Sequence, residues 1–143
     1  MNESLPSDST RTLVGGCLCG AIRYRLASAP FGAGWCHCRM CQLNSGSPAM
    51  AFAKVPSADF IVESGAERIS RYASSEIAER WFCGLCGTPL LVRDFAGTTH
   101  DFSAATLDAP AAVTPEAHFY VDSRIAWADI ADDLPRFARG RPA

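Results

Sequence analysis

The chain has 143 residues, of which 48% are hydrophobic and 20% are charged, and its formal net charge is −2. This length predicts one domain, and this composition excludes a disordered protein. The near balance of charge provides no excess of basic residues to bind nucleic acid or an anionic membrane surface. No apolar run approaches the roughly 20 residues of a membrane-spanning helix. We therefore expect neither a nucleic-acid partner nor a membrane partner.

The two ends of the chain differ from its middle. Residues 1–12 are polar and predict a flexible leader. They have neither the basic start nor the apolar stretch of a secretory signal, which favours a cytoplasmic location. Residues 13–138 contain no linker and no repeat, so they predict a single domain, and residues 139–143 predict a short basic tail.

Between the ends, short segments alternate apolar and polar residues with period two, which is typical of strands. In chain order these segments are 21–26, 50–55, 59–63, 68–73, 76–82, 89–93 and 117–121. In the segment 76–82 the alternation places Ile77 and Trp81 on one face. Only residues 38–43 favour a helix, with room for about one turn. The sequence predicts a mostly β fold of short antiparallel strands joined by irregular loops.

Seven cysteines are the most informative feature of the sequence. An odd number cannot pair completely in disulfides, and a reducing compartment disfavours disulfides altogether. By spacing they form three groups: Cys17 with Cys19, Cys36 with Cys38 and Cys41, and Cys83 with Cys86. Clustered cysteines in such a chain favour metal binding or a reactive thiol.

The spacing within each group suits a metal. In an extended chain, residues two apart point the same way, so Cys-x-Cys directs two sulfurs at one centre. In Cys-x-x-Cys the backbone turns between the sulfurs, and Gly84 and Gly87 permit the tight or left-handed conformation. Zinc takes four ligands in a tetrahedron, about 2.3 Å from each sulfur. We expect zinc, with iron as the alternative because thiolates suit both metals.

The simplest division of the seven sulfurs is four plus three. The two-cysteine groups together would make a closed structural zinc site that ties early strands to late ones. Its ligands would be Cys17, Cys19, Cys83 and Cys86. The three-cysteine group would hold a second zinc with one coordination position open, which is the layout of a reactive site. Its ligands would be Cys36, Cys38 and Cys41. This division predicts two zinc ions per chain and a zinc-binding β domain over residues 13–138, although spacing alone leaves other divisions open.

Two alternatives compete with this interpretation. Thioredoxin-like redox pairs sit at the start of a helix in a strand–helix–strand unit, a pattern that this sequence lacks. All seven cysteines would be structural if a histidine completed the second site. His37 lies between two of the cysteines, but on extended backbone it would point away from the metal and pack or hydrogen-bond nearby. His100 and His118 are isolated and are typical of ordinary histidines.

Four segments resemble one known family. They read GGCLCGAIRY at 15–24, CHCRMC at 36–41 followed by GSP at 46–48, FCGLCGTPL at 82–90, and HFYVDSR at 118–124 with Trp127 and DDLP at 132–135. Together they resemble the glutathione-dependent formaldehyde-activating enzymes, which are also described as S-(hydroxymethyl)glutathione synthases and classed as carbon–sulfur lyases. The resemblance spans residues 13–137 in order and includes all seven cysteines.

This resemblance implies a fold of several coiled antiparallel sheets around zinc, also called a β-tent. It implies the same division of ligands as the spacing. It also implies glutathione as the small-molecule thiol and formaldehyde as the aldehyde.

The predicted chemistry follows from the charge of three thiolates. A zinc held by three thiolates is a poor Lewis acid, so it lowers the pKa of bound water only weakly. A thiol has a free pKa of about 8.5, and a modest lowering of that pKa is enough to ionise it. We therefore expect a thiol to occupy the open position and its sulfur to attack an aldehyde carbon. The candidate catalytic residues are His37, Arg39 and Ser47, with Ser45 a further hydrogen-bond donor. The candidate clamps for substrate carboxylates are Arg39, Arg71, Arg93 and Arg124.

The alternative function is a non-catalytic zinc-stapled binding module. Its protein interface would use Trp35, Trp81 and Trp127, although tryptophans on strands more often belong to the core. A third possibility is zinc storage or sensing, in which the three-cysteine group releases its ion to weak chelators.

Overall fold

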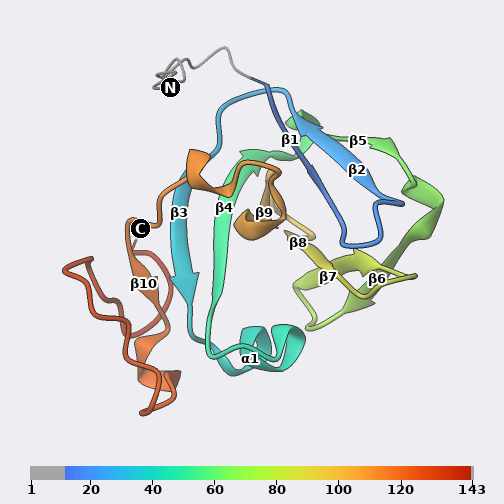
Figure 1. The fold of residues 1–143 in the computed structure, drawn as a ribbon. Helices are drawn as coiled ribbons and strands as arrows, with labels where there is room; N and C mark the ends of the chain where they lie inside the picture. Colours follow the sequence, from blue (N-terminus) through green and yellow to red (C-terminus); the bar gives the residue numbers. More distant parts are fainter. Residues whose placement is uncertain (1–11, 143) are drawn as a thin grey trace.

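The computed structural model describes residues 12–142 and has two β-sheets and one α-helix (Figure 1). The predicted leader therefore falls almost entirely outside the described residues. The strands are β1 (Leu13–Gly16), β2 (Arg23–Leu26), β3 (Phe31–Cys36), β4 (Met50–Pro56), β5 (Phe60–Ser64), β6 (Ile69–Ala73), β7 (Ala78–Cys83), β8 (Pro89–Asp94), β9 (Thr99–Ser103) and β10 (His118–Phe119). The helix is α1 (Arg39–Ser45). No helix within 12–142 is long and apolar enough to cross a membrane.

The two sheets differ in size. The small sheet has the order β1-β2-β5, and the large one has the order β10-β3-β4-β9-β8-β7-β6. Every pairing is antiparallel except that of β10 with β3. In Figure 1 the small sheet lies across the top of the view and α1 lies at the bottom. The prediction of a mostly β fold is confirmed.

The core lies between the two sheets. Because side chains alternate across a strand, the central strands β3, β4, β8 and β9 of the large sheet direct alternate residues into this core, and β2 and β5 of the small sheet close it from the other side. Its main buried members are Tyr24, Leu26, Ala33, Ala53, Val55, Phe60, Leu91, Phe102 and Leu107. Tyr24 stacks on Phe60 with ring centroids 4.4 Å apart. The opposite face of the large sheet carries the cavity described below.

The predicted strands are present, but three more were missed. β1 and β3 contain paired or alternating glycines, and β9 is largely polar, so none shows the apolar alternation that marks a half-buried strand. The segment 117–121 yields only the two residues of β10, because the next residue, Tyr120, takes a left-handed conformation. The parallel pairing of β10 also departs from the expected antiparallel arrangement.

The helix is longer than the single turn predicted from residues 38–43. The Sγ of Cys38 caps its start by accepting a hydrogen bond from the backbone N–H of Cys41 at 3.4 Å. Gly46 ends the helix in a left-handed conformation, and its N–H donates to the carbonyl of Gln42. These two caps give α1 seven residues, and the helix start fixes two of the seven cysteines.

Candidate metal centres and active site

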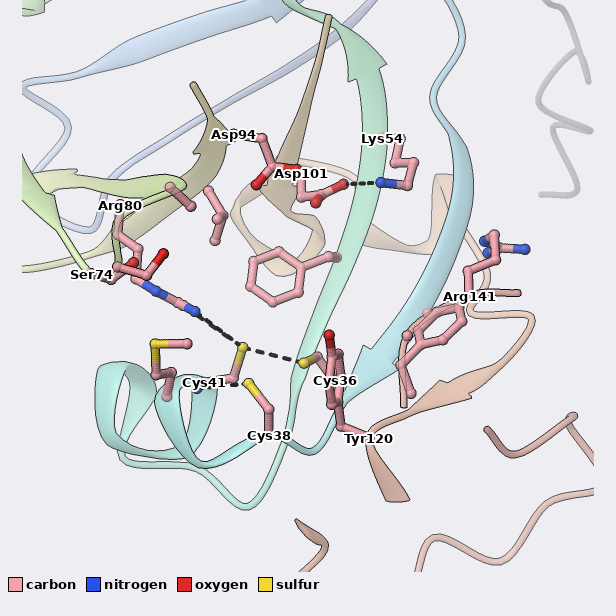
Figure 2. Close-up of a pocket in the computed structure, with 18 of the residues that line it drawn as sticks. Cys36, Cys38, Cys41, Lys54, Ser74, Arg80, Asp94, Asp101, Tyr120 and Arg141 are labelled. Carbon is pink, nitrogen blue, oxygen red and sulfur yellow. Dashed lines mark hydrogen bonds and ion pairs between the residues drawn. The ribbon is translucent and has the colours of Figure 1, made fainter. Parts of the chain in front are cut away.

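The free face of the large sheet carries a cavity of about 490 Å³ (Figure 2). Residues that alternate with the core positions line it, among them Gly34 of β3, Lys54 of β4 and Arg80 of β7. The end of β10, the chain around residues 140–141 and the first turn of α1 complete the wall. This volume lies within the range of small-molecule sites.

The three-sulfur cluster, formed by Cys36, Cys38 and Cys41, lies in the wall of this cavity. Cys36 ends β3, Cys38 caps α1, and Cys41 lies in the first turn of that helix. All three sulfurs lie within 4.8 Å of one another, and those of Cys36 and Cys41 are 3.4 Å apart. Tetrahedral zinc–thiolate bonds of about 2.3 Å imply sulfur separations of about 3.8 Å. The spacing of the cluster therefore fits a zinc ion.

The acid–base properties of this cluster also fit a cation. Hydrogen bonds from Cys36 and Cys41 hold the pKa of Cys38 well below its usual range. The contacts with Cys38 and Cys41, together with burial, raise the pKa of Cys36 far above its usual value. The protein alone thus favours one thiolate and opposes three. A cation between the sulfurs is what allows all three to ionise together.

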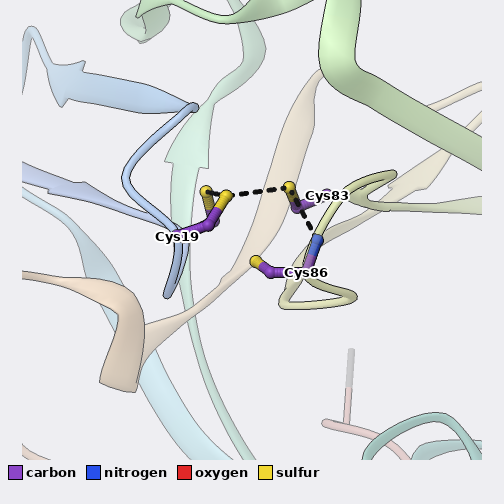
Figure 3. Close-up of side chains that lie close together, drawn as sticks. Cys19, Cys83 and Cys86 are labelled. Carbon is purple, nitrogen blue, oxygen red and sulfur yellow. Dashed lines mark hydrogen bonds between the residues drawn. The ribbon is translucent and has the colours of Figure 1, made fainter.

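The four-sulfur cluster, formed by Cys17, Cys19, Cys83 and Cys86, joins the two sheets, and none of its residues lines the cavity. Figure 3 shows Cys19 facing Cys83 and Cys86. Cys17 and Cys19 lie between β1 and β2, while Cys83 ends β7 and Cys86 lies in the turn before β8. The sulfurs of Cys17 and Cys19 are 3.5 Å apart, and those of Cys19 and Cys83 are 3.8 Å apart. These separations match tetrahedral zinc.

Backbone groups support this second cluster. The N–H groups of Leu85 and Cys86 both lie 3.4 Å from the Sγ of Cys83, where they stabilise a thiolate. Gly87 has φ +82°, and a Cβ at Gly84 would lie 2.7 Å from the Oγ of Ser70. The left-handed conformation therefore favours glycine at position 87, and a side chain at position 84 would crowd Ser70 and the carbonyl of Arg68, 3.0 Å from its Cβ.

Arg80 is the cation nearest the three-sulfur cluster. Both of its terminal nitrogens lie 3.7 Å from the Sγ of Cys41, and Nη1 donates to the side-chain oxygen of Asn44 at 3.0 Å. Its side chain is buried. Figure 2 shows the guanidinium directed from β7 towards Cys41.

Further charged groups lie elsewhere in the cavity wall. Lys54 is the only lysine of the sequence, and its Nζ lies 2.7 Å from a carboxylate oxygen of Asp101. Arg141 lies 3.3 Å from a carboxylate oxygen of Glu116, with its guanidinium over the ring of Phe119. Because these pairs are partly exposed, each side chain can exchange its partner for a bound ligand.

Tyr120 also lines the cavity, next to the strand end that carries Cys36. It is the only non-glycine residue within 12–142 with positive φ, at 57°. Such a conformation is strained for a bulky side chain and is found most often at functional sites. Its backbone N–H donates to the carbonyl of Arg139 at 3.0 Å, which holds the end of the chain against the cavity.

A buried chain of hydrogen bonds lies behind the three-sulfur cluster. His37 Nε2 and His118 Nδ1 are 2.9 Å apart, and His118 Nε2 lies 3.0 Å from both carboxylate oxygens of Asp132. Burial lowers the pKa of His37, which favours a neutral ring. The amide of Gln42 donates to the carbonyl of His37 at 2.8 Å. These contacts fix the loop between Cys36 and Cys38.

Comparison with known proteins places this site in a family. The profile described as glutathione-dependent formaldehyde-activating enzyme matches residues 12–123. The chain belongs to this family. A Halomonas elongata protein whose name assigns it to the same family is 32% identical over 127 residues, which cover 82% of this chain and 80% of that protein. The resemblance of the four sequence segments is therefore confirmed.

Two further comparisons concern a name and a fold. A Schizosaccharomyces pombe protein named as an uncharacterised lyase is 41% identical over 78 residues, 53% of each chain. The crystal structure of a Rhodobacter sphaeroides protein has a TM-score of 0.59 at 23% identity, over 86% of this chain and 98% of that one, and shows the same fold. The family and the lyase name place this protein among the carbon–sulfur lyases.

Several residues proposed from the sequence lie outside the cavity of this family member. Arg39 is exposed and donates to the side chain of Gln42 at 3.2 Å, so it supports the loop rather than the cavity. The Oγ of Ser45 donates to the carbonyl of Cys41 at 2.7 Å and accepts from the backbone N–H of Ser47 at 3.0 Å, so both serines shape the end of α1. His37 is turned towards His118.

The proposed carboxylate clamps also lie elsewhere. Arg71 and Arg93 both face Glu79, at 3.8 Å and 3.1 Å, on the face of β7 opposite to Arg80. Arg124 is exposed and donates to the carbonyl of Val121 at 3.3 Å. Register explains this outcome, because Arg71 pairs with Trp81 and therefore shares its face.

The cationic residues of the cavity were missed from the sequence. The sequence did contain a signal for Arg80. The period-two alternation that places Trp81 on one face of the strand also places Arg80 on the opposite face. Ile77, expected beside Trp81, precedes β7 and lines the cavity. No local signal marks Lys54 or Arg141, since only strand pairing and the path of the last residues bring them to the cavity.

The three tryptophans predicted for a protein interface differ in exposure. Trp127 alone among them is mostly exposed, at 76%.

Proposed function

We propose that this protein forms or cleaves a thiol–aldehyde adduct, such as S-(hydroxymethyl)glutathione, at the three-sulfur cluster. One observation carries the proposal: three cysteine sulfurs converge on the wall of a cavity of small-molecule size, whereas the four-sulfur cluster lies outside that cavity. An unequal division of this kind is typical of one structural and one reactive zinc site.

The proposal includes two zinc ions per chain. Cys17, Cys19, Cys83 and Cys86 would hold the structural ion. Cys36, Cys38 and Cys41 would hold the other, and it would supply the stabilisation of an external thiolate in its open coordination position. Residues 13–138 would form a single zinc-binding β domain. A reducing compartment such as the cytoplasm suits this role, because it keeps all seven thiols free of disulfides.

The cavity offers groups for the charged ends of glutathione. Lys54 and Arg141 are the cations available for substrate carboxylates, and they replace the arginines that the sequence suggested. Asp94 and Asp101 line the same cavity and would face the substrate ammonium group. Apolar side chains such as Phe52 and Val92 cover the rest of the wall and exclude water. These groups would orient the thiol with its sulfur towards the three-sulfur cluster.

Tyr120 is the candidate for the oxygen of the aldehyde. In the forward direction the thiol sulfur forms a bond with the aldehyde carbon, and the carbonyl π electrons move to the oxygen. The thiol gives up its S–H proton to water and the oxygen takes up one proton to become the hydroxyl of the adduct, so the reaction neither gains nor loses a proton overall. The hydroxyl of Tyr120, a residue of the cavity wall, would donate a hydrogen bond to this oxygen. In reverse the same groups release the aldehyde.

An exchange measurement tests the proposal. Glutathione and formaldehyde also combine spontaneously, so the rate of interconversion with S-(hydroxymethyl)glutathione is measured by NMR line broadening with and without protein. We expect the wild-type protein to accelerate exchange and Cys38→Ser to return it to the spontaneous rate, with Ser47→Ala as the matched control that keeps activity. A wild-type rate equal to the spontaneous rate would overturn the proposal.

A further inference from the structure

Arg80 occupies an unusual environment for an arginine. Its side chain is only 8% exposed. The guanidinium contacts Cys41 with both terminal nitrogens and Asn44 with one of them, and its Nε is buried without a hydrogen-bond partner. Arginines are almost never buried this completely unless they are paired.

The partner that would balance this charge is a thiolate. Within 12–142, carboxylates pair with Arg23, Arg25, Arg71, Arg93, Arg136 and Arg141, and with no other arginine. A buried cation without a counter-charge is strongly unfavourable. Among residues 12–142, Cys41 is the only ionisable group to which the Arg80 guanidinium donates a hydrogen bond, and Arg80 forms no salt bridge there. A negative charge on the three-sulfur cluster would therefore balance the buried guanidinium of Arg80.

We infer that Arg80 is the counter-charge of the three-sulfur cluster and that it makes the site selective for an anionic ligand; this inference rests on the proposed function. Three thiolates around a divalent cation leave one negative charge, which would repel an incoming thiolate. The Arg80 guanidinium cancels that charge through its N–H···S contacts with Cys41. Arg80 is thus a positioning residue, since it acts on the ligand through Cys41.

The same contacts weaken electron donation by Cys41. An N–H group directed at a thiolate stabilises the sulfur lone pairs, so the sulfur gives less charge to a bound metal. The open position becomes a better acceptor of electron pairs than three unassisted thiolates would allow. This effect offsets the poor Lewis acidity that the sequence predicts for a zinc held by three thiolates.

Two ligands of different charge test the inference. In cobalt-substituted protein, binding of azide and of imidazole is followed by visible absorption for wild type, Arg80→Gln and Arg80→Lys. We expect Arg80→Gln to weaken azide about 10- to 100-fold and imidazole less than about twofold. Arg80→Lys keeps the charge and should retain most azide affinity. The control is Arg71→Gln, because Arg71 faces Glu79 on the opposite side of the sheet. Equal effects of Arg80→Gln on both ligands, or no effect on azide, would overturn the inference.

A second readout separates this inference from the proposed function. The sulfur-to-cobalt charge-transfer band needs no external ligand, and loss of the N–H···S contacts should move it to lower energy in Arg80→Gln. If wild-type protein binds neither ligand, the open position is disproved, and an unshifted band then disproves the role of Arg80 as well. Should Arg80→Gln fail to fold, Arg80→Lys must still shift the band, because a single ammonium cannot reproduce both contacts.

Discussion

The two sulfur clusters consist of the same residue type but lie in different surroundings. The four-sulfur cluster joins two sheets across a long stretch of sequence, and backbone N–H groups surround its sulfurs. The three-sulfur cluster comes from six consecutive residues, faces a cavity and contacts a buried guanidinium. These surroundings are the basis of our proposal that the four-sulfur cluster is structural and the three-sulfur cluster reactive.

The largest expected effect concerns the four-sulfur cluster, which we propose to be structural. Cys83→Ser should abolish the cooperative unfolding transition, because a lost ligand releases a metal whose binding energy is folding energy. The loss is on the order of the whole stability of a small domain, about 5–15 kcal/mol. Thermal unfolding followed by circular dichroism measures it. An unchanged melting temperature would show that this cluster does not hold the fold.

The matching substitution in the other cluster should separate folding from activity. Cys41→Ser should leave the circular dichroism spectrum intact, remove one of two zinc ions and return the exchange rate to the spontaneous value. The reason is that its sulfur lies at the cavity wall and closes no long loop. Metal analysis and the exchange assay check this together. Collapse of the fold in Cys41→Ser would make both clusters structural.

Removal of metal should distinguish the clusters without any substitution. A coloured chelator at micromolar concentration should extract one zinc ion quickly and the second only as the protein unfolds. On our proposal, the chelator would enter the open position at the three-sulfur cluster, whereas the four-sulfur cluster would offer no free position. Absorbance of the zinc–chelator complex gives the two rates. Release of both ions at one rate would contradict a functional difference between the clusters.

A smaller effect is expected from Tyr120→Phe. Loss of its hydroxyl should lower kcat about 10- to 100-fold with little change in KM, because the hydrogen bond to the aldehyde oxygen strengthens as that oxygen gains charge. Tyr72→Phe is the control, since Tyr72 is exposed on β6 and lies outside the cavity. Equal activity of both variants would remove Tyr120 from the mechanism.

The smallest effect concerns substrate orientation. Lys54→Met should raise KM for glutathione about three- to tenfold, because a partly exposed ion pair contributes little. Arg25→Met removes a comparable cation that pairs with Glu63 on the small sheet, and it should leave KM unchanged. Steady-state kinetics with glutathione measures the difference. A Lys54→Met protein with normal KM would place the carboxylates of the substrate elsewhere.

The sequence predicted the parts of this molecule that local patterns encode. Cysteine spacing gave the grouping of the sulfurs, and apolar alternation gave seven strands. The missing parts depend on pairing between distant segments. Arg71 and Arg93 were among the predicted clamps and Arg80 was not, and only the register of β6, β7 and β8 shows that Arg80 is the one that faces the cavity. Arg141 reaches the wall because the end of the chain pairs beside Tyr120.

Cobalt substitution combined with glutathione titration tests the central claim most directly. The protein should bind two cobalt ions per chain, and millimolar glutathione should change the thiolate-to-cobalt absorption of one ion only. Wild-type protein and Cys41→Ser, which retains the four-sulfur cluster alone, identify which ion responds. A spectrum that glutathione leaves unchanged would contradict the claim that the three-sulfur cluster accepts an external thiol.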